Sequence, residues 1–224
     1  MKALIVEDEE IVRELLESIA LREFEFEEVK GAGDGESGWE IFAREPFDFV
    51  VMDLVLPRLD GLKLAQRMLA AVPEIRILAL SSECDDYTVR QIQSTGILGF
   101  VDKNEMSLEV LFEAYNEVSA GHVFYSKNVQ EKVLEIWQNP NAFYKILSET
   151  ELSVIQALAI GQKEGAIAAH LAVSPNLIRR QKGDIMKKLG LKNDGDLVRF
   201  ALEKGIIKNK GGLNWTMPHL NQKG

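Results

Sequence analysis

Residues 47–53 of this 224-residue chain read FDFVVMD, and residues 54–61 continue with LVLPRLDG. A short, unbroken apolar run bounded by turn residues is typical of a buried strand in a parallel sheet. The run ends at Asp53, and the carboxyl ends of the strands form the ligand-binding crevice of an open α/β sheet. Aspartate is also common at strand ends for local hydrogen bonding, so the role of Asp53 depends on the rest of the chain.

Strand and helix patterns alternate over the first 121 residues. Segments with helical periodicity separate short apolar segments. The segments that we interpret as strands are residues 2–6, 26–33, 47–53, 75–80 and 98–101. This alternation predicts an α/β doubly wound, flavodoxin-like domain with a five-stranded parallel sheet.

The composition is that of a globular protein, with 46% hydrophobic and 27% charged residues. The apolar runs are far shorter than the roughly 18 residues that a membrane helix requires, and the N-terminus turns acidic at Glu7, too early for a signal peptide. The single Cys84 excludes an internal disulfide, and the three histidines lack the spacing of metal ligands. We therefore expect a cytoplasmic protein without membrane contact.

The net charge of −9 is distributed unevenly along the chain. Residues 1–145 contain 14 lysines and arginines against 28 acids, whereas residues 146–210 contain 11 against 7. A basic segment beside an acidic one favours nucleic-acid binding by the basic part.

Polar side chains follow four of the predicted strands. Glu7 and Asp8 follow the first, Asp53 ends the central one, and Ser81 and Lys103 follow the last two. Parallel strands bring their carboxyl ends to one edge of the sheet, so these residues are expected to converge. Three neighbouring carboxylates repel one another, and a hard divalent cation such as Mg²⁺ relieves that repulsion.

Residues 146–208 predict a small all-α domain of four helices. Residues 148–151 read SETE, a capping box that opens the first helix. A short helix over 164–171, a turn, and a longer helix that Ser174 caps and Pro175 starts form a helix-turn-helix pattern. We expect Leu177, Ile178, Ile185 and Leu189 to face inward. The basic outer face could meet DNA phosphates, although such a face is also common on solvated helices.

The domain limits follow from these patterns. We place the first domain at residues 1–121 and the helical domain at 146–208. Residues 122–145 are interpreted as a linker with a helix near 127–137, and residues 209–224 as a flexible tail because they are polar and glycine-rich.

The convergent residues of the first domain resemble the receiver domain of two-component response regulators. The resemblance implies that Asp53 accepts a phosphoryl group from a sensor histidine kinase. It also implies the remaining roles: Glu7, Asp8, Asp53 and the Val55 backbone bind Mg²⁺, Ser81 and Lys103 stabilise the phosphoryl group, and Phe100 is the aromatic residue that reorients on activation.

The helical domain resembles the LuxR-type helix-turn-helix in LSETE at 147–151, in Gly161 and in IMKKLGL at 185–191. Together the two domains resemble a response regulator of the NarL/FixJ type. The resemblance implies double-stranded DNA contacts by Ser174, Asn176, Arg179, Arg180, Lys182, Lys187 and Lys188, and dimerisation through Leu197, Val198, Ala201 and Leu202 of a helix near 196–205.

This chain departs from the family pattern at three places in the helical domain. Gly165-Ala166, Gln181 and Gly183 replace the usual Lys-Glu pair, a histidine and a polar residue. A glycine inside a helix also costs about 1 kcal/mol relative to alanine.

The sequence therefore predicts a phosphorylation-switched transcription regulator that forms a homodimer on activation and is not a conventional enzyme. One alternative is a receiver whose degenerate helix-turn-helix binds a protein partner instead of DNA. Another is a pseudo-receiver that folds and dimerises without phosphorylation.

Overall fold

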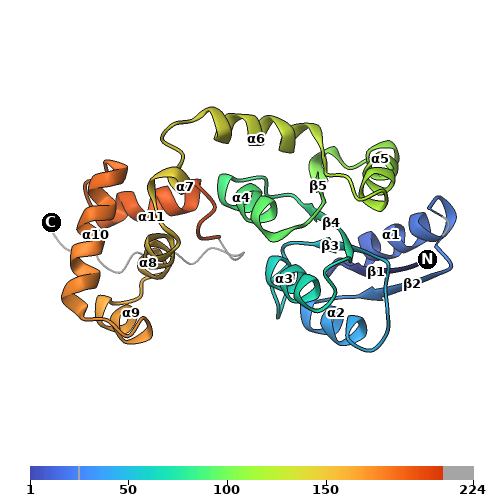
Figure 1. The fold of residues 1–224 in the computed structure, drawn as a ribbon, viewed down its shortest axis with the longest axis horizontal. Coiled ribbons are helices and arrows are strands. Elements are labelled where there is room, and N and C mark those ends of the chain that lie inside the picture. The colour runs from blue at the N-terminus through green and yellow to red at the C-terminus, as the bar shows by residue number, and fades with distance from the viewer. Residues whose placement is uncertain (25, 209–224) are drawn as a thin grey trace, which may run out of the picture. The chain divides into compact units, whose positions relative to one another are not determined.

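The computed structural model describes residues 1–24 and 26–208. The chain divides into two compact units, one formed by residues 1–142 and the other beginning at Phe143 (Figure 1). The tail predicted at residues 209–224 lies outside the described residues. Within the part that the structure describes, no helix has the length and apolar character needed to span a membrane.

The first unit is a parallel α/β sheet. Its strand order is β2-β1-β3-β4-β5-β6, which places β3 between β1 and β4. The strands are β1 Lys2–Val6, β2 Glu28–Ala32, β3 Phe49–Asp53, β4 Arg76–Ser81, β5 Gly99–Asp102 and β6 Phe124–Tyr125. The helices are α1 Glu10–Arg22, α2 Gly35–Phe42, α3 Gly61–Ala71, α4 Asp86–Thr95, α5 Leu108–Ser119 and α6 Lys127–Gln138, with a 3-10 turn at Lys103–Glu105.

The doubly wound fold is confirmed, but the sheet has six strands where the sequence predicted five. The sixth strand, β6, pairs with β5 through Phe124 beside Gly99 and Tyr125 beside Phe100. A strand of two residues is too short to show alternation, so its sequence carries no strand signal.

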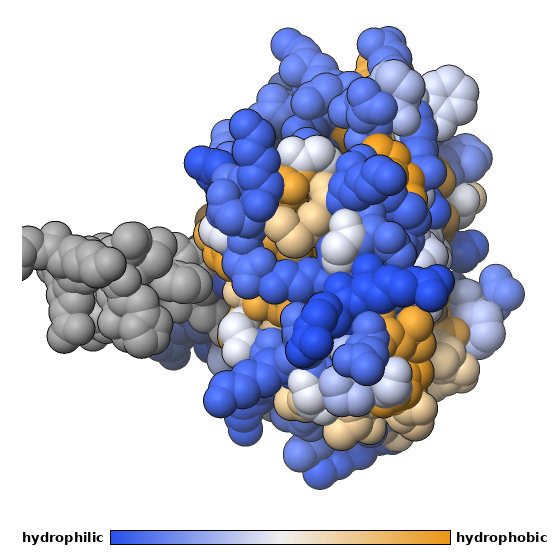
Figure 2. Space-filling model, turned by 90° about the vertical axis from the view of Figure 1, so that its left-hand side faces the viewer, coloured by the Kyte–Doolittle hydropathy of each residue, from blue (hydrophilic) through white to orange (hydrophobic). Residues whose placement is uncertain are grey.

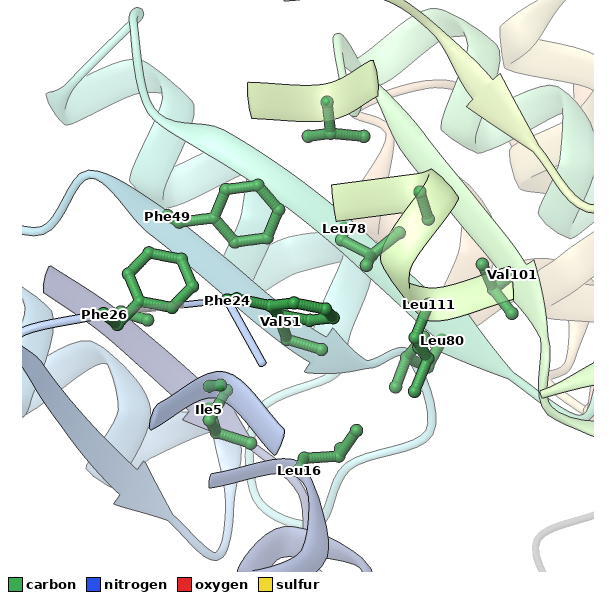
Figure 3. Close-up of a cluster of buried hydrophobic side chains, with 14 of the residues drawn as sticks. Ile5, Leu16, Phe24, Phe26, Phe49, Val51, Leu78, Leu80, Val101 and Leu111 are labelled. Carbon is green, nitrogen blue, oxygen red and sulfur yellow. The ribbon is translucent and has the colours of Figure 1, made fainter. Parts of the chain in front are cut away.

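The central strand β3 is buried along its whole length, as its unbroken apolar sequence predicted. Residues on one face of the sheet pack against α1 and α5, and Figure 3 shows Ile5 of β1 near Leu16 of α1 and Leu80 of β4 beside Leu111 of α5. Burying a side chain as large as Phe49 contributes about 1.5–3 kcal/mol to folding. This core fixes the strand ends that carry the site.

The segment after α5, predicted as a linker, is built into the first unit. The Ser126 backbone N–H donates to the Phe100 carbonyl at 3.0 Å, and the Ser126 hydroxyl accepts from the Asp102 backbone N–H at 3.1 Å. Lys132 of α6 pairs with Asp86 of α4 at 2.9 Å, and Val129 is fully buried. The helix predicted at 127–137 is therefore present, and the compact unit extends to Ala142.

The second unit is helical. It contains the one-turn α7 Phe143–Ile146, which the sequence did not predict, followed by α8 Glu149–Ala159, α9 Glu164–His170, α10 Pro175–Leu189 and α11 Asp194–Glu203. Ser148 and Glu151 form the predicted capping box, and Gly190 ends α10 with a φ of 68°, in the left-handed region that favours glycine.

The inward face of α10 is narrower than the sequence predicted. Ile178 and Ile185 are fully buried, whereas Leu177 is 37% exposed and therefore does not belong to the core. Leu177 lies in the first helical turn of α10, directly after the loop that joins α9 to α10.

Candidate functional site

Three carboxylates meet at the carboxyl edge of the sheet. Glu7 and Asp8 follow β1, Asp53 ends β3, and one oxygen from each lies within 4.8 Å of the others. Glu7 and Asp53 are buried, at 1% and 7% exposed, while Asp8 is exposed. The sheet therefore brings together the acids that the sequence placed at one edge.

Lys103 joins this cluster from the loop after β5. Its Nζ donates to Asp53 Oδ2 at 2.6 Å and to Glu7 Oε2 at 2.7 Å. Burial alone would lower the pKa of Lys103, but the hydrogen bonds to Asp53 and Glu7 outweigh it and raise that pKa above its ordinary value. Lys103 is thus a charged ammonium that bridges two buried carboxylates.

The charge at this edge is not balanced by Lys103 alone. Burial raises the pKa of Glu7, and the hydrogen bond from Lys103 opposes that rise only in part. Three carboxylates and one ammonium leave two negative charges when all are ionised. A set of carboxylate oxygens with this residual charge fits a hard divalent cation.

The loop after β3 holds Asp53 in place. Asp53 Oδ1 accepts a hydrogen bond of 2.8 Å from the Val55 backbone N–H, while the Val55 residue is 46% exposed. Arg58, with a φ of 64°, pairs with the buried Asp34 at the start of α2, so the loop is tied to a neighbouring helix.

Ser81 and Phe100 lie on the strands beside this edge. Ser81 ends β4, is fully buried, and its hydroxyl accepts from the Glu83 backbone N–H at 3.1 Å. Phe100 is also fully buried, in β5 between Ala79 of β4 and Tyr125 of β6. The Phe100 side chain therefore lies inside the protein in this structure.

Gly61, the first residue of α3, packs directly against the backbone at the end of β3. A Cβ at this position would lie 2.3 Å from the Asp53 carbonyl oxygen and 2.6 Å from the Leu54 Cα. We predict that Gly61→Ala lowers the free energy of unfolding by about 2–3 kcal/mol, because backbone atoms have to move. Urea unfolding measures this change, and Gly165→Ala is the control because a Cβ at Gly165 meets nothing within 4 Å. Equal stability of the two variants would contradict the prediction.

The predicted DNA-contacting residues lie on α10 or at its start. Ser174 caps the helix by accepting from the Leu177 backbone N–H, and Asn176 and Lys187 are exposed. The Arg180 side chain is 81% exposed, with Asp184 one turn away at 3.9 Å. Figure 2 views this side of the second unit and shows a mostly hydrophilic surface with small hydrophobic patches.

Three other cations of α10 have carboxylate partners that the sequence analysis missed. The pairs are Arg179 with Glu164 of α9 at 3.1 Å, Lys182 with Asp194 of α11 at 2.7 Å, and Lys188 with Glu151 of α8 at 2.6 Å. The Lys182 side chain is only 19% exposed. No spacing rule within one helix could reveal these partners, because each lies on a different helix.

The residues predicted for dimerisation separate into two groups. Leu197 and Ala201 are buried, at 2% and 0% exposed, and α11 packs on α8, so these two belong to the core and cannot contact a partner. Val198 is half-buried and Leu202 is 37% exposed. The dimerisation prediction therefore rests on Val198 and Leu202.

Curated relatives cover almost the whole chain. Oxygen regulatory protein NreC of Staphylococcus carnosus is 29% identical over 216 residues, which cover 92% of this chain and 99% of NreC. Transcriptional regulatory protein DegU of Brevibacillus brevis is 23% identical over 226 residues, which cover 93% of this chain and 95% of DegU.

Solved structures show the same fold. RcsB, a two-component response regulator solved in complex with DNA, aligns with a TM-score of 0.61 at 23% identity and covers 89% of this chain and 96% of its own. RcsB of Salmonella enterica serovar Typhimurium, bound to a promoter in the presence of a phosphomimetic, also aligns with a TM-score of 0.61.

Two family models match the two units. The response regulator receiver domain matches residues 3–116, about half of the chain, and the luxR family of bacterial regulatory proteins matches residues 145–201. These matches agree with the sheet that carries the acidic cluster and with the helix-turn-helix after it. The chain belongs to the response regulator family, with a receiver domain followed by a luxR-type domain.

Proposed function

We propose that phosphorylation of Asp53 by a sensor histidine kinase switches this response regulator between a weakly and a tightly DNA-binding state. The observation that carries the proposal is the convergence of Lys103, Glu7 and Asp53 within hydrogen-bonding distance. A carboxylate that attacks phosphorus needs neutralisation of charge and correct positioning more than covalent assistance, and this arrangement supplies both.

In the proposed reaction, a carboxylate oxygen of Asp53 forms a bond to phosphorus as the bond from phosphorus to the donor nitrogen breaks. Mg²⁺, held by Glu7, Asp8, Asp53 and the Val55 carbonyl, would supply positive charge to the phosphoryl oxygens. Lys103 already contacts Asp53 Oδ2 and pairs with a phosphoryl oxygen once the group is attached. The Ser81 hydroxyl donates to another oxygen, and Phe100 reorients in response.

The proposed output is DNA binding by the luxR-type domain. Helix α10 would enter the major groove, with Ser174, Asn176, Arg180 and Lys187 on its exposed surface. RcsB has been solved as two dimers bound to two parallel DNAs, which supports a homodimer here. Two linked copies on two half-sites raise affinity through effective concentration, without any new contact.

Phosphoryl labelling tests the receiver half of this proposal. The full chain is incubated with acetyl phosphate and Mg²⁺, trapped with borohydride, and mapped by mass spectrometry. Borohydride reduces an aspartyl phosphate to homoserine with release of phosphate, so the expected result is homoserine at position 53 alone. If no homoserine forms, the pseudo-receiver alternative takes the place of the proposal. If labelling succeeds but the chain does not retain DNA at physiological salt, the alternative of a helix-turn-helix that binds a protein partner is favoured.

The residue two positions after the acceptor is expected to govern how long the phosphoryl group persists. Hydrolysis needs a water held in line with phosphorus, and the exposed Val55 side chain has no donor or acceptor with which to hold one. We predict that Val55→Asn accelerates autodephosphorylation by roughly 3- to 10-fold and leaves Mg²⁺ affinity unchanged, because the proposed metal contact is the backbone carbonyl.

Decay of the phosphoprotein in excess Mg²⁺, without a kinase, measures this effect. Val55→Ala is the matched control, because it opens the approach to phosphorus without adding an amide. Equal decay rates in Val55→Asn and the wild-type protein would show that water access is governed elsewhere, most directly by Glu83 or the loop at Cys84.

A further inference from the structure

The basic surface of α10 is largely neutralised by the domain itself. The helix carries five cations and one acid, Asp184. Three of the cations pair with carboxylates from the other helices of the unit, at 2.6–3.1 Å. The net charge of α10 alone is +4, and the net charge of α10 together with these three carboxylates is +1. This surface is therefore far less attractive to a phosphate backbone than the sequence of the helix suggests.

The pairs differ in how easily DNA could replace the carboxylate. The Arg179 side chain is 70% exposed and its partner Glu164 is 26% exposed, so the guanidinium can reach a phosphate after leaving the pair. The Lys182 side chain is 19% exposed, whereas its partner Asp194 is 73% exposed, so Lys182 has little access to a ligand outside the domain. Arg179 is thus the cation for which Glu164 and a phosphate compete most directly.

We propose that Glu164 is an affinity-determining residue that competes with DNA phosphate for Arg179. Glu151 acts in the same way on Lys188, whereas Asp194 keeps Lys182 within the domain. The inference rests on the proposed DNA binding and deepens it. A single copy of the domain then binds DNA weakly, and tight binding depends on two copies acting together. The partner is the phosphate backbone of double-stranded DNA, irrespective of its sequence.

Competition for Arg179 changes how DNA binding depends on salt. Each phosphate neutralised by a protein cation releases counterions and adds about 0.9 to the slope of log K against log salt. A cation that stays paired with a carboxylate of the protein releases no counterions. Freeing Arg179 should therefore steepen the slope as well as raise the affinity.

The experiment measures binding of the full chain to a labelled duplex of random sequence at several salt concentrations. Glu164→Gln is expected to bind roughly 3- to 10-fold more tightly at 0.1 M salt, with a slope steeper by about 0.9. Glu203→Gln is the matched control, because it removes the same charge from the exposed end of α11 without releasing a cation of α10. The effect of Glu203→Gln measures how much DNA affinity the protein gains merely by losing one negative charge.

A second pair of variants separates competition from a purely structural role of Glu164. In an Arg179→Ala background, Glu164→Gln should no longer steepen the slope, because no guanidinium remains to be freed. Thermal unfolding of all variants shows whether the domain stays folded. A structural role would change the unfolding temperature and leave the slope unchanged.

The proposal is overturned if Glu164→Gln gains no more affinity or slope than Glu203→Gln, or if the gain persists without Arg179. This failure is distinct from failure of the proposed function, in which neither the wild-type protein nor Glu164→Gln binds the duplex at low salt.

Discussion

Asp53→Asn is expected to abolish stable phosphorylation, with at least about a 100-fold loss of phosphoprotein after incubation with acetyl phosphate and Mg²⁺. Asparagine keeps the shape of the side chain but lacks the carboxylate that attacks phosphorus. It also removes the negative charge that pairs with the Lys103 ammonium, whose Nζ lies 2.6 Å from Asp53 Oδ2. The measurement is phosphoprotein formation, followed by separation on a phosphate-affinity gel.

Asp48→Asn is the matched control for this loss. Asp48 precedes β3 at the opposite end of the same strand, where it is exposed and accepts from the Lys2 backbone N–H at 2.7 Å. The Asp48→Asn variant should be phosphorylated at the wild-type level, because the site residues lie at the other end of the strand. Equal labelling of Asp53→Asn and the wild-type protein would reject Asp53 as the acceptor.

The second large effect is expected at the DNA-binding surface. The double variant Arg179→Ala/Arg180→Ala should weaken binding to double-stranded DNA by roughly 10- to 100-fold and flatten the salt slope by about one unit, because Arg180 contacts a phosphate while Arg179 remains paired with Glu164. Loss of Arg179 also leaves the Glu164 carboxylate without its partner near the DNA, which adds repulsion. Fluorescence anisotropy at several salt concentrations measures both quantities.

A variant of equal charge separates local contacts from net charge. Arg199→Ala/Lys204→Ala removes two positive charges from α11 and its end, outside the helix-turn-helix. Its effect on binding should be several-fold smaller than that of the α10 variant. If both variants weaken binding equally, α10 does not contact the phosphates, and the protein-partner alternative is favoured.

The sequence predicted the site of the first unit because the topology of a parallel sheet is enough to show which strand ends lie close together. Asp53 ends a strand that is buried on both faces and so has an unmistakable apolar pattern, and parallel strands bring Glu7 and Lys103 to the same edge. Convergence of strand ends requires no knowledge of side-chain packing. The strand β6 was missed because Phe124 and Tyr125 are too few residues to form a pattern.

The helical unit was harder to predict, because its features depend on which helices face one another. The family resemblance implied that Leu197 and Ala201 of α11 take part in dimerisation, but the sequence did not show that α11 packs on α8 and that both residues are buried. Likewise, the acid that pairs with Lys188 lies 37 positions earlier in the chain, on a different helix. Such pairs arise from tertiary packing. The sequence therefore showed a basic helix face, but not the carboxylates of other helices that neutralise most of its charge.

Selection from a library of random duplex sequences shows whether phosphorylation of Asp53 controls DNA binding. The full chain and Asp53→Asn are each incubated with Mg²⁺, with and without acetyl phosphate, and the retained DNA is sequenced. We expect the phosphodonor to increase strongly the retention of sequences with two half-sites by the wild-type protein and to have no effect on Asp53→Asn. If both proteins retain the same sequences equally, with or without the phosphodonor, phosphorylation of Asp53 does not control DNA binding.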